Sequence, residues 1–184
     1  MGKKSRFWTS LVTWKAGWLG AVISASQGLP VLGSMIVFAT AIGAAALGGG
    51  GVRELRLLGI AVAGGYMIDS SMVIMGVIGF PDDAQFGGPS TIWMSLLWAN
   101  LAMNTRCGLV FGWLDGRPWL AMALGALTGP LAYLAGARVG AVDLPSGKLV
   151  AFGALAVTWA LAFPLIYLLR ERIVTLGEPM PASA

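Results

Sequence analysis

Long apolar stretches, each of roughly the length that crosses a membrane, fill almost the whole of this chain. They cover residues 7–27, 31–47, 55–80, 92–114, 118–139 and 149–169. A hydrocarbon layer about 30 Å thick is crossed by about 20 helical residues. The sequence therefore predicts an all-α membrane protein, with a bundle of six transmembrane helices in residues 1–170 and a short cytoplasmic tail over residues 171–184.

The composition excludes a water-soluble globule. Hydrophobic residues make up 57% of the 184 residues and charged residues only 11%, which is too little polar surface to cover a soluble domain. The net charge of +4 does not indicate a nucleic-acid partner. The basic residues lie at the ends of the expected helices, and not in one patch beside aromatic residues.

The distribution of basic residues predicts the orientation of the chain. Lys and Arg accumulate in short cytoplasmic loops. With six spans, one side carries only Arg138 and Lys148, and the other carries Lys3, Lys4, Arg6, Arg53, Arg56, Arg117, Arg170 and Arg172. Both termini are therefore expected in the cytoplasm. A five-helix alternative, in which the first span begins after Lys15, is disfavoured because it places Arg170 and Arg172 outside.

The N-terminal stretch and the tryptophans also bear on the number of helices and their orientation in the membrane. A cleaved signal peptide is an alternative for the first stretch, but Lys15 interrupts the apolar core that such a peptide needs. An uncleaved first helix is favoured. Amphipathic rings anchor helices at membrane interfaces, and this role is expected for Trp8, Trp113 and Trp119 near inner boundaries and for Trp93 near an outer one.

Three charged residues, Lys15, Asp69 and Arg106, lie well inside apolar stretches. An ionisable side chain there costs at least a few kcal/mol unless it is paired or hydrated. Helical geometry places Asp69 and Asn100 at the same depth, and it places Asn104 on the stripe of Asn100. We expect Asp69 to bond Asn100 or Asn104 with Arg106 nearby. The same four residues are the candidate ligand-binding site.

Small residues recur every three or four positions in the stretch 118–139. The glycines are Gly125, Gly129, Gly136 and Gly140. Such spacing lets neighbouring membrane helices approach closely, so these glycines are expected to be helix-packing residues.

Several kinds of chemistry are excluded by what the chain lacks. It has no histidine, which most membrane haem, copper and di-iron centres use as a ligand. Its one cysteine, Cys107, has no histidine as a general base. We therefore expect no catalytic residue, no metal and no cofactor.

A resemblance accompanies the glycine-rich stretch. The run Gly129-Pro130-Leu131-Ala132-Tyr133-Leu134-Ala135-Gly136-Ala137-Arg138-Val139-Gly140-Ala141, with Ile68-Asp69-Ser70, Leu97-Trp98, Trp159 and Pro164-Leu165, resembles a small bacterial inner-membrane family described only as a domain of unknown function. Many members carry a histidine near the position of Cys107, and this departure removes any shared imidazole chemistry. Members are often encoded beside cyclopropane-fatty-acid synthase-like enzymes, so the resemblance implies a role in membrane lipid or acyl-chain modification.

Two functions remain open. The first is a non-catalytic accessory or subunit of a membrane complex, whose partners would be membrane lipids and another integral membrane protein. The alternative is a small-molecule binding or transport module with a polar intramembrane site around Asp69. A membrane enzyme that uses Asp69 has less support, because no second catalytic group converges on that residue.

Overall fold

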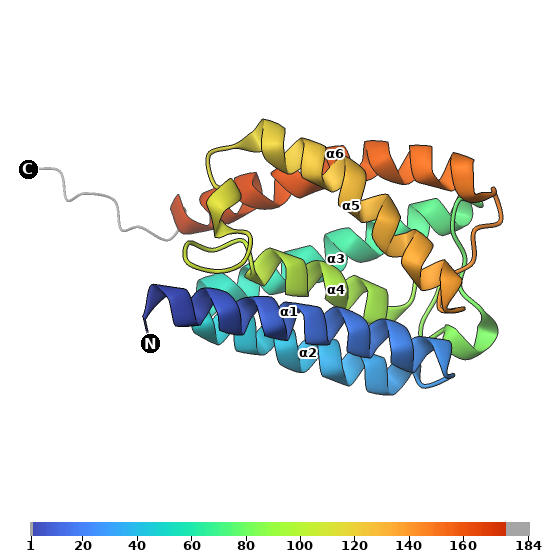
Figure 1. Cartoon of the computed structure of the whole chain (residues 1–184), viewed down its shortest axis with the longest axis horizontal. Helices are drawn as coiled ribbons and strands as arrows, with labels where there is room; N and C mark the ends of the chain where they lie inside the picture. The colour runs from blue at the N-terminus through green and yellow to red at the C-terminus, as the bar shows by residue number, and fades with distance from the viewer. Residues whose placement is uncertain (1, 176–184) are drawn as a thin grey trace, which may run out of the picture.

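The computed structural model describes residues 2–175, and these residues form six α-helices (Figure 1). The helices are α1 (Lys3–Ser26), α2 (Pro30–Leu47), α3 (Val52–Ile74), α4 (Ile92–Met103), α5 (Pro118–Arg138) and α6 (Lys148–Thr175). Two short 3-10 helices, η1 (Asp82–Ala84) and η2 (Gly112–Leu114), lie in the connections. The all-α class is confirmed.

Four of the helices, α2, α3, α5 and α6, are long and apolar enough to cross a membrane. The chain is therefore a membrane protein. α1 has 24 residues but is not among the four. α4 is too short.

The largest correction to the prediction concerns the stretch 92–114, which is not one helix. α4 has only 12 residues and ends at Met103, so it rises about 18 Å, too little to cross a hydrocarbon layer. The expected C-terminal tail is described only in part. α6 continues to Thr175, so the expected tail from residue 171 begins as helix, and residues 176–184 lie outside the described part of the chain.

The helices pack as two units. In the first, which we call the four-helix unit, α1 packs on α2, α2 on α4, and α3 on α4. In the second, which we call the hairpin, α5 packs along α6. Figure 1 shows the hairpin lying across the four-helix unit, with α3 and α6 adjacent at the back.

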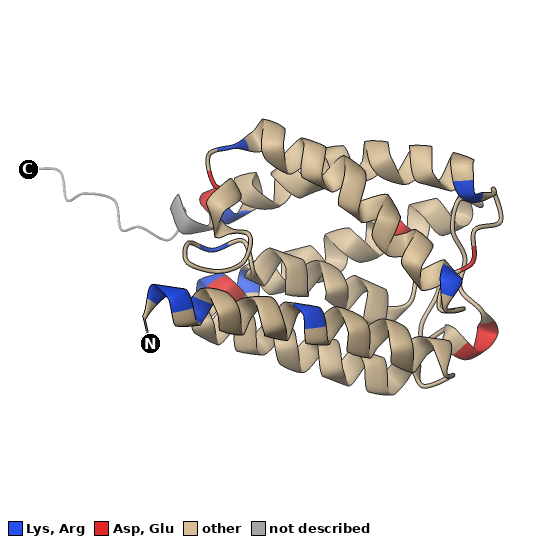
Figure 2. Ribbon diagram, in the orientation of Figure 1, with Lys and Arg blue, Asp and Glu red and all other residues tan. Residues whose placement is uncertain are grey.

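Charged residues gather at the two ends of the bundle (Figure 2). Most of the Lys and Arg residues lie at the end where α1 begins and α6 ends, whereas the acidic helix η1 lies at the opposite end. We call these the N-terminal end and the far end. One basic residue, Lys15, lies near the middle of α1, away from both ends.

Side chains of α4 and the loop after it explain why the helix stops. The side-chain amide of Asn104 donates a hydrogen bond to the carbonyl oxygen of Asn100 at 2.8 Å. The carbonyl oxygen of Asn104 then accepts from the backbone N–H of Phe111 at 3.0 Å, which closes a loop. Gly112 fits here because a Cβ atom would lie 2.2 Å from the carbonyl oxygen of Arg106. Local side-chain bonds of this kind compete with a continuing helix.

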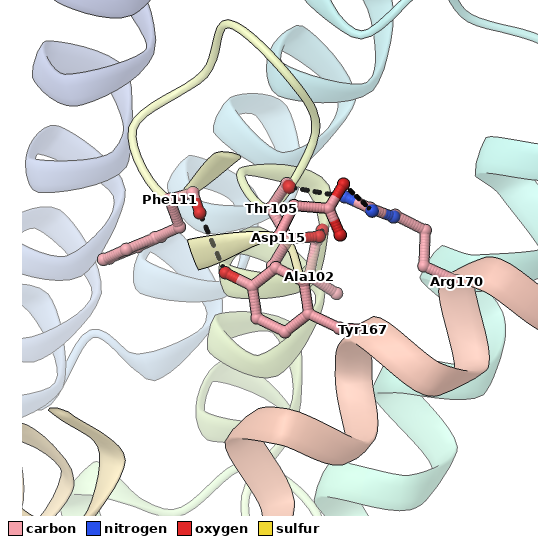
Figure 3. Close-up of polar contacts among 6 residues, drawn as sticks. All are labelled: Ala102, Thr105, Phe111, Asp115, Tyr167 and Arg170. Carbon is pink, nitrogen blue, oxygen red and sulfur yellow. Dashed lines mark hydrogen bonds and ion pairs between the residues drawn. The ribbon is translucent and has the colours of Figure 1, made fainter. Parts of the chain in front are cut away.

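Residues of α6 hold this non-helical segment in place (Figure 3). Arg170 donates from Nη1 to the carbonyl oxygen of Thr105 at 2.6 Å and pairs through Nη2 with Asp115 at 2.5 Å. The hydroxyl of Tyr167 donates to the carbonyl oxygen of Phe111 at 2.9 Å. Non-helical backbone at membrane depth is tolerated where protein satisfies its polar groups, and α6 satisfies two of these carbonyls.

The far end of the bundle joins the two units through the backbone. Gly79, in the loop after α3, exchanges two hydrogen bonds of 2.9 and 2.8 Å with Asp143, in the loop between α5 and α6. The hydroxyl of Ser146 also donates to the carbonyl oxygen of Val77 at 3.2 Å. The hairpin is thus tied to the four-helix unit at both ends, and the space between these ties holds the site described next.

Candidate binding cavity

A cavity of about 390 Å³ lies between the four-helix unit and the hairpin. Five of the eight tryptophans line it, namely Trp14, Trp18, Trp93, Trp98 and Trp159. Aliphatic residues, glycines and three further aromatic residues make up most of the rest, and Lys15 is the one charged residue among the described lining side chains. The walls are therefore apolar and aromatic, with a single cation.

The cavity is elongated along the helices. Its lining runs along α5 from Leu124 to Gly136, about 18 Å at the rise of a helix. On α1 the lining runs from Trp14 to Val22, about 12 Å.

The cavity opens on the side of the bundle. In the described part of the chain, α1 and α5 flank the cavity but have almost no contact with each other. The lining residues Lys15, Thr128 and Leu131 are exposed at its surface. The opening between α1 and α5 therefore faces the surroundings of the helices.

A buried carboxylate fixes one wall of the cavity. Asp69 on α3 is fully buried. Its carboxylate accepts a hydrogen bond from the indole Nε1 of Trp98 at 2.8 Å and another from the hydroxyl of Tyr133 at 2.5 Å. The ring of Trp98 stacks on that of Trp159, with centroids 4.2 Å apart and planes 10° from parallel. One side chain thus links α3, α4 and α5 and orients three aromatic residues of the wall.

Glycines make room for the two stacked indoles. A Cβ atom on Gly65 would lie 2.2 Å from Cγ of Trp98, and one on Gly129 would lie 2.2 Å from Cγ of Trp159. Without side chains at these positions, the stacked rings lie directly against the backbones of α3 and α5.

The other candidate packing glycines of this segment differ in their surroundings. A Cβ atom on Gly125 would lie 2.4 Å from the carbonyl oxygen of Trp159, so the backbones of α5 and α6 meet there. At Gly136 the nearest atom, from Val142, would be 3.2 Å away. Gly140 lies beyond the end of α5 with φ +81° and no atom within 4 Å of a Cβ. It is a turn residue whose left-handed backbone favours glycine, so the packing role expected for it needs correction.

The four candidate ligand residues do not form the expected cluster. The expected bond from Asp69 to Asn100 or Asn104 is wrong, since the carboxylate bonds Trp98 and Tyr133. Asn100 instead donates to the carbonyl oxygen of Trp14 at 3.4 Å, and Asn104 donates to Asn100. Both asparagines are fully buried.

Arg106 is also placed differently from the expectation. Since α4 ends at Met103, Arg106 lies in the following loop and not on the helix face assumed from the sequence. It forms an ion pair with Glu54 near the start of α3. None of the residues Asp69, Asn100, Asn104 and Arg106 lines the cavity. Asp69 contributes to it only by positioning Trp98 and Tyr133.

The tryptophans outside the cavity lie where interfacial anchors are expected. Trp8, Trp113 and Trp119 are 61%, 52% and 77% exposed, in segments at the N-terminal end of the bundle.

Trp93, which lines the cavity, was also expected to be an interfacial anchor, and this expectation is wrong. It is fully buried, and its Nε1 donates to the carbonyl oxygen of Ala84 at 3.0 Å.

Sequence reasoning missed the side chains that build this cavity. Trp14 and Trp18, four residues apart on α1, face it together with Lys15. Tyr133 belongs to the run that carries the family resemblance, but no pattern in the sequence assigns it a partner. A useful signal was present: residues four apart share a helix face, so the pair Trp14 and Trp18 marks one aromatic face.

The apolar and aromatic side chains around the cavity are suited to binding. Both oxygens of Asp69 are engaged by hydrogen-bond donors and the side chain is fully buried. Within residues 2–175, no group of three His, Cys, Asp or Glu side chains could hold a metal ion. Cys107 lines a separate hollow of about 340 Å³ with Lys3, Lys4 and Trp8.

Comparison with known proteins gives one match. Residues 7–165 match the model of a family described as "Protein of unknown function (DUF2878)". No curated protein and no solved structure matches the chain. The match covers α1 from Phe7 onward, α2 to α5 and most of α6, and with them every residue that lines the cavity. The chain therefore belongs to this family of proteins of unknown function.

Proposed function

We propose that this protein is a binding module of the bacterial inner membrane, which takes a hydrophobic, chain-like ligand from the bilayer into the cavity between α1 and α5. In this proposal the chain crosses the membrane six times, α4 and the loop after it together making one crossing. Both termini lie in the cytoplasm. The basic residues at the N-terminal end of the bundle support this orientation, because such residues accumulate on the cytoplasmic side.

The observation that carries the proposal is the aromatic cavity itself. Its volume of about 390 Å³ falls in the range of small-molecule sites, which are mostly apolar, aromatic and concave. In a bilayer its side opening would face acyl chains and not water. An apolar cavity of this size that is reachable from the lipid favours an apolar occupant.

Two other functions were expected from the sequence and have less support. A ligand site at Asp69 itself lacks space, because the carboxylate is fully buried and bonded to Trp98 and Tyr133. An accessory role in a membrane complex, linked to lipid or acyl-chain modification, stays a prediction.

Fluorescence quenching tests the proposal. In a background where Trp8, Trp113 and Trp119 are replaced by phenylalanine, the five remaining tryptophans all line the cavity. We call this background the five-tryptophan protein. A neutral single-chain probe, octadecanol brominated at mid-chain, should quench its emission in detergent in a saturable way. Ala132→Phe should weaken the apparent affinity about tenfold, equivalent to about 1.4 kcal/mol, because Ala132 lines the cavity.

The matched control is Ala123→Phe, the same change on the same helix. Ala123 is exposed and is not part of the lining, so this variant should bind the probe like the five-tryptophan protein. Thermal unfolding in detergent establishes that both variants are folded. Quenching that does not saturate, or that is equal in the two variants, would show that the probe does not occupy the cavity.

A further inference from the structure

We infer that the ligand is a single-chain amphiphile with one anionic head group, and that Lys15 is the counter-ion of that group. This inference rests on the proposed function, since it names the class of ligand that the cavity takes. A long-chain carboxylate is a ligand of this class.

The position of Lys15 is the first step. It lies twelve residues beyond Lys3 on α1, about 18 Å along the helix axis. It is also the one charged residue in the described lining of the cavity. Ionisable side chains at such depth are rare and are paired or hydrated, because the hydrocarbon interior does not solvate their charge. Lys15 therefore needs a compensating group at this level.

The described residues, 2–175, do not supply that group. Arg106, the other basic residue predicted to lie inside an apolar stretch, is paired with Glu54. Lys15 has no carboxylate partner in the part of the chain that the structure describes, residues 2–175, and its Nζ lies 4.5 Å from the centroid of the Trp14 ring. The ring attracts the cation through its π face, but it accepts no conventional hydrogen bond. The three N–H groups of the ammonium remain available to an anion.

The shape of the cavity indicates which chemical group the anionic head group of the ligand carries. The apolar lining extends from the level of Lys15 toward the far end, through Trp18 and Val22 on α1 and Gly136 on α5. A head group at Lys15 would leave an apolar chain in this elongated space, parallel to the helices. The exposure of Lys15 at the opening lets the head group reach it from the lipid side.

The charge requirement is tested by a matched pair of probes. Brominated octadecanoate and brominated octadecanol differ in the head group alone, and both are titrated against the five-tryptophan protein at alkaline pH. The carboxylate should bind about tenfold more tightly than the alcohol, as expected for a charge-assisted hydrogen bond. Lys15→Met should remove this preference, whereas Lys15→Arg should retain it.

The control for loss of a positive charge is Lys148→Met. Lys148 is the first residue of α6 at the far end and does not line the cavity, so this variant should retain the preference. If the two probes bind equally, or if Lys15→Met leaves the preference intact, the inference is wrong and the proposed function still stands. If neither probe gives saturable quenching, both are wrong.

Discussion

Gly65→Ala should destabilise the protein by about 1–3 kcal/mol, the usual cost of overpacking a core. The new methyl carbon would lie 2.2 Å from Cγ of Trp98, well inside van der Waals contact. Trp98 cannot yield easily, because its Nε1 is bonded to Asp69 and its ring is stacked on Trp159. Reversible unfolding in mixed micelles, with increasing amounts of a denaturing detergent, measures the loss.

The neighbouring residue gives the control for Gly65. Gly64 lies on the same helix, and a Cβ atom there would meet nothing within 4 Å. Gly64→Ala should therefore leave the free energy of unfolding unchanged or raise it slightly, since alanine favours a helix over glycine. An equal loss in both variants would mean that α3 does not pack against Trp98 as described.

Asp69→Leu should have the other large effect, a loss of about 2–4 kcal/mol in the free energy of unfolding. The indole N–H of Trp98 and the hydroxyl of Tyr133 would both lose their acceptor inside the protein. Each buried donor left without a partner costs about 1–3 kcal/mol. Asp69→Asn should cost less, because its side-chain oxygen can still accept one of the two bonds. The same mixed-micelle unfolding measures both variants.

A double-mutant cycle separates this specific link from a general loss of packing. Tyr133→Phe removes one of the two donors while retaining the ring. Combined with Asp69→Leu, it should cost less than the sum of the two single changes, with a coupling of at least about 0.5 kcal/mol. Strict additivity would indicate that Asp69 and Tyr133 do not interact and that α3 and α5 are not joined through them.

Most helices of this fold follow from hydropathy alone, and α4 shows where that approach fails. The predicted stretches 31–47 and 118–139 match α2 and α5 to within one residue. The stretch 92–114 is also largely apolar, but Asn104 redirects the backbone and Gly112 permits a close approach of the chain to itself. Hydropathy averages over such residues, so it cannot detect a helix that ends inside an apolar stretch.

The candidate site was predictable only in part. The cost of a charge in hydrocarbon identified Asp69 as a residue that must face other helices, and it is fully buried. Its partners are the aromatic donors Trp98 and Tyr133, and not the asparagines expected from the sequence. Trp98 and Tyr133 come from helices whose neighbours depend on the whole bundle, and no periodicity in one helix predicts which side chains of another it will face.

Lys15 is a second residue whose role could not be predicted from the sequence. The sequence identified it as an interior cation, but its importance depends on the cavity beside it. That cavity exists because α1 and α5 flank a common space with almost no contact in the described structure. Such a space is a property of tertiary packing, and the sequence shows only the aromatic face of α1 that borders it.

The most direct test of the central claim, that the aromatic cavity holds a chain from the bilayer, is native mass spectrometry of the protein extracted with its own lipids. The account predicts a retained single-chain species at one copy per protein, present in Ala123→Phe and depleted in Ala132→Phe. A protein that carries no such species, or that carries equal amounts in both variants, would contradict it.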